Sequence, residues 1–80
     1  MEDANDVHDY VQFKKEYQSF VQEIVQHRKE SHSSQSDTAE WIGVERRKII
    51  EFETGEKINI ELLFILADKF DVNINFNKFF

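Results

Sequence analysis

Residues 34–55 read SQSDTAEWIGVERRKIIEFETG and contain the clearest structural signals in the sequence. Ser34 and Asp37 have the spacing of a capping box, in which a serine oxygen and an acid satisfy the free groups of a first helical turn. Gly43 has the backbone freedom that a tight turn requires. The stretch therefore predicts two short helices, the first ending at Gly43 and the second covering about residues 45–52.

Two short helices separated by a glycine turn form a helix-turn-helix, a motif that places its second helix in the major groove of DNA. Only a small side chain fits where two such helices approach most closely, and apolar side chains must fill the wedge between them. The chain has Ala39 at the close approach, Gly43 in the turn, and Val44 and Ile49 in the wedge. The motif therefore predicts DNA binding through helix 45–52.

The rest of the chain predicts further helices. Apolar residues recur at steps of three and four from residue 10 to about residue 29, which predicts a long first helix. Residues 1–6 are acidic with little to bury, so we expect a flexible arm. Residues 60–70 are expected to form a helix, and residues 73–80 a short fifth helix or a strand. The expected fold is one all-α domain over residues 7–80, a compact bundle of about five helices.

Composition excludes several classes of protein. The chain has 80 residues and no cysteine, which favours one small core without disulfides or thiolate metal sites. His8, His27 and His32 lack metal-ligand spacing, and no catalytic constellation is present, so we expect no metal, cofactor or enzyme activity. The longest apolar run, residues 62–67, is far below the roughly 20 residues that span a bilayer. We therefore expect a cytoplasmic protein without membrane contact.

Charge is unevenly distributed along the chain. The net charge of −6 argues against nucleic acid, because DNA affinity comes from Lys and Arg that displace counterions. The net charge is −4 over residues 1–25 and −3 over residues 49–80, but +1 over residues 26–48. Positive charge is therefore concentrated at the predicted motif.

The motif resembles the lambda-repressor and Cro-like family, also called the Xre family, of helix-turn-helix DNA-binding proteins. The resemblance covers about residues 20–75 and implies a bundle of the lambda-repressor type that acts as a transcriptional repressor. It also implies an ion pair between Arg28 of the first helix and Glu53 at the end of the recognition helix. The matching positions are Ser34, Gln35, Ala39, Glu40, Gly43, Val44, Ile49, Glu53 and Gly55, followed by residues 63–72.

Several positions before, within and after the motif depart from the family pattern. The family usually has glycine and leucine at the positions of His32 and Ser33, and leucine at the position of Thr38. We therefore expect a looser first connection. After the recognition helix the family often has basic residues, whereas this chain has Glu56 and a single Lys57. This difference predicts weaker phosphate binding and leaves the expected fold unchanged.

The candidate DNA contacts follow from the motif and the resemblance. Arg46 stands at the start of the recognition helix and is followed by two further cations. The paired N–H donors of an arginine suit the O6 and N7 acceptors of guanine. The N-terminus of the second helix favours a phosphate, and Ile50 lies one turn after Arg46, where a thymine methyl is a suitable partner. An ordinary solvated helix face is the alternative for these residues. The expected contacts are Gln35, Arg46, Arg47, Lys48, Ile50 and Lys57.

The predicted fourth helix has apolar residues on two sides. At 100° per residue, one side faces the core and the other is surplus in a monomer. The surplus side, with the aromatic tail, predicts a partner-binding surface; the alternative is that the first helix or the tail folds over it. The expected core side is Ile60, Leu63, Phe64, Ala67 and Phe70, and the opposite side is Leu62, Ile65 and Leu66. The expected homodimer interface is Leu62, Ile65, Phe76, Phe79 and Phe80.

Two functions remain open at this point. The first is a homodimeric, sequence-specific repressor that presents two recognition helices to double-stranded DNA. The second is a protein-interaction module, such as the antitoxin of a toxin–antitoxin pair, in which the acidic surface and apolar tail neutralise a basic partner. In that second case DNA binding is secondary or lost.

Overall fold

The computed structural model describes residues 2–76, with side chains from residue 9 onward, and contains four α-helices in this range. Residues 72–76 follow the last helix as extended chain, and no strand is present in the described range. The prediction of an all-helical chain is confirmed. Neither the predicted fifth helix nor the predicted strand is present as far as Phe76, and residues 77–80 lie outside the described residues. The helices are α1 (Glu2–Glu30), α2 (Gln35–Ile42), α3 (Arg46–Thr54) and α4 (Ile60–Lys69).

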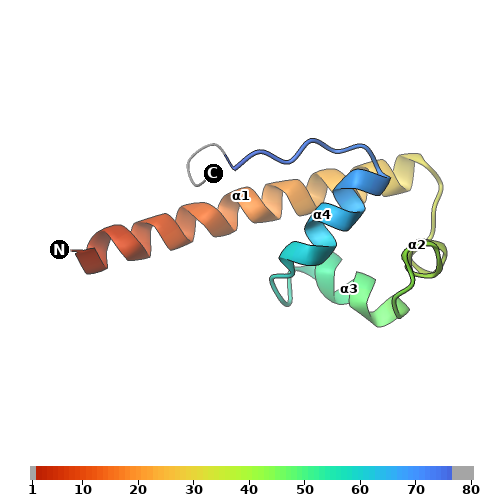
Figure 1. Cartoon of the computed structure of the whole chain (residues 1–80), viewed down its shortest axis with the longest axis horizontal. Helices are drawn as coiled ribbons and strands as arrows, with labels where there is room; N and C mark the ends of the chain where they lie inside the picture. The colour runs from red at the N-terminus through yellow and green to blue at the C-terminus, as the bar shows by residue number, and fades with distance from the viewer. Residues whose placement is uncertain (1, 77–80) are drawn as a thin grey trace.

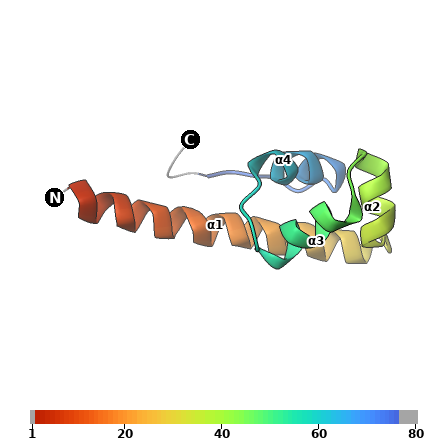
Figure 2. The same ribbon diagram turned by 90° about the horizontal axis from the view of Figure 1, so that it is seen from below.

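Helix α1 is the longest element. Helices α3 and α4 pack against its C-terminal half, and α2 packs against α3 (Figure 1). It begins at Glu2, so residues 2–6, which we expected to form a flexible arm, continue the helix. After α4 the chain turns back and runs along α1 in both views (Figures 1 and 2). The fold therefore extends along α1, with principal dimensions of 47 × 22 × 16 Å.

The ends of the two short helices have the residues that their geometry requires. The Ser34 Oγ accepts a hydrogen bond from the Asp37 N–H at 2.9 Å, which confirms the serine cap of α2. Gly43 and Gly55 end α2 and α3 with φ of +83° and +77°, the left-handed region that glycine adopts without strain. Helix α3 begins one residue later and ends two residues later than predicted, at Arg46 and Thr54.

Hydrogen bonds close the connection between α1 and α2, which we expected to be loose. His32 occupies the left-handed region with φ +58°. The hydroxyl groups of Ser33 and Thr38 lie 2.8 Å apart and share a hydrogen bond. Because Thr38 is fully buried, this bond satisfies polar groups that would otherwise be costly inside the core. A polar pair therefore ties this connection to α2.

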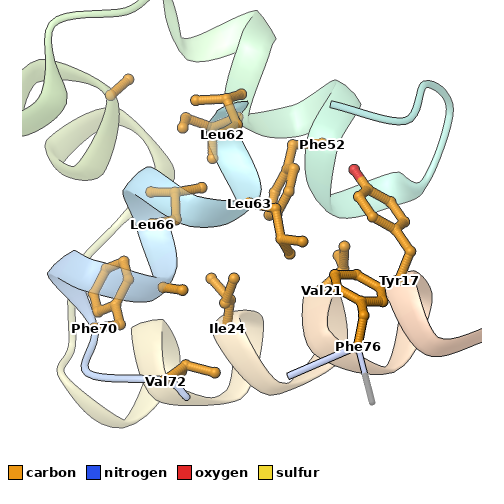
Figure 3. Packing of buried hydrophobic residues seen from close by; sticks show 13 residues of the cluster. Tyr17, Val21, Ile24, Phe52, Leu62, Leu63, Leu66, Phe70, Val72 and Phe76 are labelled. Carbon is orange, nitrogen blue, oxygen red and sulfur yellow. The ribbon is translucent and has the colours of Figure 1, made fainter. Parts of the chain in front are cut away.

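The core lies between α1, α3, α4 and the extended tail (Figure 3). Phe76 of the tail stacks on Phe13 with ring centroids 5.1 Å apart and meets Phe20 edge to face at 5.0 Å. Both partners are on α1, so aromatic contacts fix the tail along that helix. The core residues without exposed surface are Ile24, Ile49 and Leu63.

Helix α4 is rotated from the orientation that its apolar pattern predicted. Leu62 and Leu66 are buried, whereas Ile60 and Phe64 are 38% and 49% exposed, so the predicted core side is wrong at these four positions. Residues 62–67 are all apolar, and such a run does not specify which side packs inward. Packing against the neighbouring helices selects the side instead.

This rotation changes the predicted dimer interface. Leu62 is 5% exposed and Phe76 only 2%, so the expectation that a single chain leaves them exposed is wrong. The tail folds back over the core, which was the alternative considered for this surface. Ile65 remains 44% exposed. Phe79 and Phe80 lie outside the described residues.

A buried tyrosine connects α1 to the start of α4. The Tyr17 hydroxyl accepts a hydrogen bond from the Asn59 N–H at 2.8 Å, and the Asn59 side chain caps α4 by accepting from the Leu62 N–H at 3.0 Å. Burial raises the pKa of Tyr17 above its ordinary value of 10.0, and the Asn59 hydrogen bond opposes part of this shift. The fold therefore favours the neutral phenol.

Replacing Tyr17 with Phe should lower the free energy of unfolding by about 0.5–1.5 kcal/mol at neutral pH, because the Asn59 N–H loses its acceptor. A raised folded-state pKa stabilises the fold below the unfolded pKa of about 10, and this contribution is lost as pH rises through the folded-state value. The gap between wild type and Tyr17→Phe should therefore narrow above about pH 10. Urea unfolding of both proteins from neutral to alkaline pH measures this difference in the free energy of unfolding.

The matched control is Tyr10→Phe, because the Tyr10 side chain is 59% exposed. The free energy of unfolding of this variant should differ from that of wild type by a constant amount across the same pH range. A Tyr17→Phe gap that is constant or grows at alkaline pH would contradict the burial of a neutral phenol.

Candidate nucleic-acid interface

An almost fully buried ion pair joins α1 to the end of α3. Arg28 Nε donates to Glu53 Oε2 at 2.6 Å and Arg28 Nη2 donates to Glu53 Oε1 at 3.0 Å. The two side chains are 10% and 8% exposed. This two-bond geometry is the strong form of an Arg–carboxylate contact. The ion pair that the resemblance implied is therefore present.

Two further hydrogen bonds extend this ion pair into a network of four elements. Arg28 Nη1 donates to the Ser33 carbonyl at 2.8 Å, in the connection before α2. Gln35 Nε2 in the first turn of α2 donates to Glu53 Oε1 at 3.0 Å. Gln35 was predicted to contact DNA, but its amide is already bound to Glu53. We call Arg28, Ser33, Gln35 and Glu53 the anchor network.

The anchor network and the apolar wedge together fix α2 against α3. Ala39 and Ile49 are buried at 3% and 0% exposure, and Val44 in the turn is partly buried against the core. A helix of nine residues such as α3 is marginal in isolation, so its stability and direction come from these contacts.

Cations cluster at the free end of α3. Arg46, Arg47 and Lys48 are exposed, and none forms an ion pair with a described residue. Glu45 at the N-cap position makes no side-chain hydrogen bond to the first turn. The helix dipole adds partial positive charge at this end. The exposed end of α3 therefore presents arginine donors to solvent at the positive end of the helix dipole.

The remaining predicted contacts lie nearby on α3 and in the loop that follows it. Ile50 is half-buried, one turn beyond Arg46. The Lys57 side chain is 71% exposed, with its Nζ 4.0 Å from Glu51 Oε2, so it is weakly paired and accessible. Residues 46–57 thus bring five of the six predicted contacts onto one helix and its following loop, while Gln35 belongs to the anchor network.

Sequence reasoning missed the polar contacts that position this surface. Neither the Gln35–Glu53 hydrogen bond nor the Ser33–Thr38 pair was expected, because local patterns do not show which side chains from distant turns meet. The only available signal was the implied Arg28–Glu53 pair, whose carboxylate has lone pairs left for a further donor.

Other kinds of site are not seen in the described part of the chain. No group of three His, Cys, Asp or Glu among residues 9–76 is arranged to hold a metal ion. Within the described part of the chain, no helix is long and apolar enough to cross a membrane. Comparison with protein-family models, with curated proteins and with solved structures gives no match.

Replacing Glu53 with Gln should lower the free energy of unfolding by about 3–5 kcal/mol, because it leaves the buried Arg28 guanidinium without its counter-charge. Glu51→Gln is the matched control on the same helix, since it makes the same chemical change next to the exposed Lys57 and should cost less than about 1 kcal/mol. Chemical denaturation of both variants measures the difference. Equal losses would show that the anchor network does not hold α3.

Proposed function

We propose that the chain is a sequence-specific regulator of transcription that binds double-stranded DNA with α3 in the major groove, in the manner of lambda-repressor and Cro-like proteins. The observation that supports this most strongly is the cluster of Arg46, Arg47 and Lys48, exposed at the end of a helix whose other end is locked by the anchor network. A rigid helix with a free cationic end is what insertion into a groove requires.

The proposed contacts divide into two kinds. Arg46 and Arg47 supply paired donors for guanine O6 and N7, and the exposed part of Ile50 suits a thymine methyl. Lys57 binds phosphate, which contributes affinity without sequence information. The Gln35 amide donates one hydrogen bond to Glu53, and the rest of this amide and the N-terminus of α2 are proposed to approach a phosphate.

The acidic balance of the chain favours discrimination between DNA sequences. At a net charge of −6, the protein is repelled from DNA at long range. Binding therefore depends on close contacts at a matching site rather than on general attraction. A steep loss of affinity on mismatched DNA is the expected consequence.

A second candidate function rests on the outward side of α4. Phe64 and Ile65 are 49% and 44% exposed, and at 100° per residue Glu61 and Asp68 lie between them. A symmetric dimer through this face brings like charges together unless the copies are offset. A basic protein partner, as for an antitoxin, has no such conflict. We propose that the DNA-binding form is a homodimer in which the two copies pair through this face with an offset. A hetero-complex with a basic protein is the alternative.

Arg46→Ala or Arg47→Ala should weaken binding to the selected DNA site by about 1–3 kcal/mol and relax its sequence preference. Lys57→Ala should weaken all sequences alike and lower the salt slope by about one. Fluorescence anisotropy titrations at several salt concentrations, with a site selected from random duplexes, measure both effects. If the arginine variants lose equal affinity for selected and random DNA, α3 does not read bases.

Sedimentation at micromolar concentration should show a dimer that Ile65→Asp converts to a monomer, because a buried unpaired carboxylate is costly in an interface. Ser36→Asp, a new acid at an exposed position of α2, is the control and should leave the dimer intact. A wild-type monomer would rule out this interface and favour the hetero-complex.

A further inference from the structure

A hollow runs between α1 and the chain that leaves α3. Its larger part has a volume of about 380 Å³, with Lys15, Gln18 and Gln22 on the α1 side and Thr54 and Gly55 on the other. A second part of about 310 Å³ shares Gln18 and Gly55 and adds Lys14. Apart from the apolar Val21, the α1 side chains in this wall are basic or neutral hydrogen-bond donors.

Helix α1 separates its charges between two sides. At 100° per residue, its exposed lysines and two glutamines fall within one sector, which includes the wall of the hollow. The exposed and half-exposed acids fall in a separate sector that points away from it. We call the first sector the basic flank. The basic flank contains Lys14, Lys15, Gln18, Gln22 and Lys29, and the opposite sector contains Asp9, Glu16, Glu23 and Glu30.

The basic flank shares a surface with the proposed reading helix. Arg46, Ile50 and Thr54 follow one another at steps of four on α3, so they lie on one side of that helix, and Thr54 lines the hollow. Glu53 also lies in the wall, but Arg28 neutralises its charge. The exposed Glu56 borders only the second part. The side of α3 that carries Arg46 therefore leads to the hollow and to its α1 wall.

The length of the basic flank fits a DNA backbone. Lys15 lies thirteen residues before Arg28, which at 1.5 Å per residue places it about 20 Å along α1 from the anchor network. Duplex DNA rises 3.4 Å per base pair, so this distance corresponds to about six base pairs. A duplex read by α3 therefore has phosphates within reach of Lys15 if it extends along α1.

We propose that the basic flank of α1 binds the phosphate backbone of DNA that adjoins the site read by α3. Lys14 and Lys15 pair with phosphates, and the amides of Gln18 and Gln22 donate hydrogen bonds to phosphate oxygens. This inference rests on the proposed DNA-binding function and adds a second contact region to it. The acidic opposite side of α1 keeps the helix from binding in the reverse orientation.

The test combines a variant with a change in duplex length. Wild-type protein first selects a site from random duplexes, and that site is then prepared with and without about six flanking base pairs on each side. Anisotropy titrations compare wild type, Lys15→Gln and Lys69→Gln on both duplexes. Lys69 is an exposed lysine of α4 outside the basic flank, so its variant is matched in chemistry and net charge. Thermal unfolding checks that both variants remain folded.

On the long duplex, Lys15→Gln should weaken binding on the order of threefold or more and lower the salt slope by about 0.9, the value for one lost phosphate contact. Both effects should disappear on the trimmed duplex, and Lys69→Gln should show neither. Equal behaviour of the two variants on the long duplex overturns this inference but leaves the proposed function standing. Failure of wild type to select any duplex overturns both.

An acidic protein segment is the competing occupant of the basic flank. A polyglutamate peptide serves as its probe in the same titrations. If this peptide binds more tightly than DNA and its binding depends on Lys15, the basic flank belongs to a protein partner and the proposal is overturned.

Discussion

The ion pair between Arg28 and Glu53 is the contact on which the arrangement of the helices depends. Buried ion pairs add little net stability compared with apolar packing, but breaking one partner is strongly destabilising. Their geometry is also specific, and here one guanidinium and one carboxylate engage α1, α2, α3 and the first connection. The pair therefore fixes the direction of α3, whose exposed cations carry the proposed function.

Much of this arrangement could be predicted from short-range sequence signals. Ser34 caps α2 and two glycines end α2 and α3, because capping and left-handed turns depend on residue types at fixed local positions. The Arg28–Glu53 pair was implied by the family resemblance and is present. The exposure of Arg46 and Arg47 also follows, since Ile49 and Phe52 define the buried side of α3.

The orientation of α4 and the path of the tail could not be predicted, because both depend on long-range packing. An unbroken apolar run carries no periodic signal, so Leu62 was placed outside and Phe64 inside, the reverse of the structure. The tail was expected to form a short helix or a strand, yet up to Phe76 it forms neither, and Phe76 packs on the rings of Phe13 and Phe20 of α1. The role of Gln35 was missed for the same reason, since its partner Glu53 is distant in sequence.

In the proposed complex, α3 enters the major groove of DNA while α4 stays outside. The most direct measurement is a two-dimensional ¹⁵N NMR titration of the full chain with its selected duplex. We expect the largest chemical-shift changes at residues 46–51 and at the N-terminus of α2, and small changes at Phe64 and Ile65. Large shifts on α4 with an unperturbed α3 would contradict this arrangement.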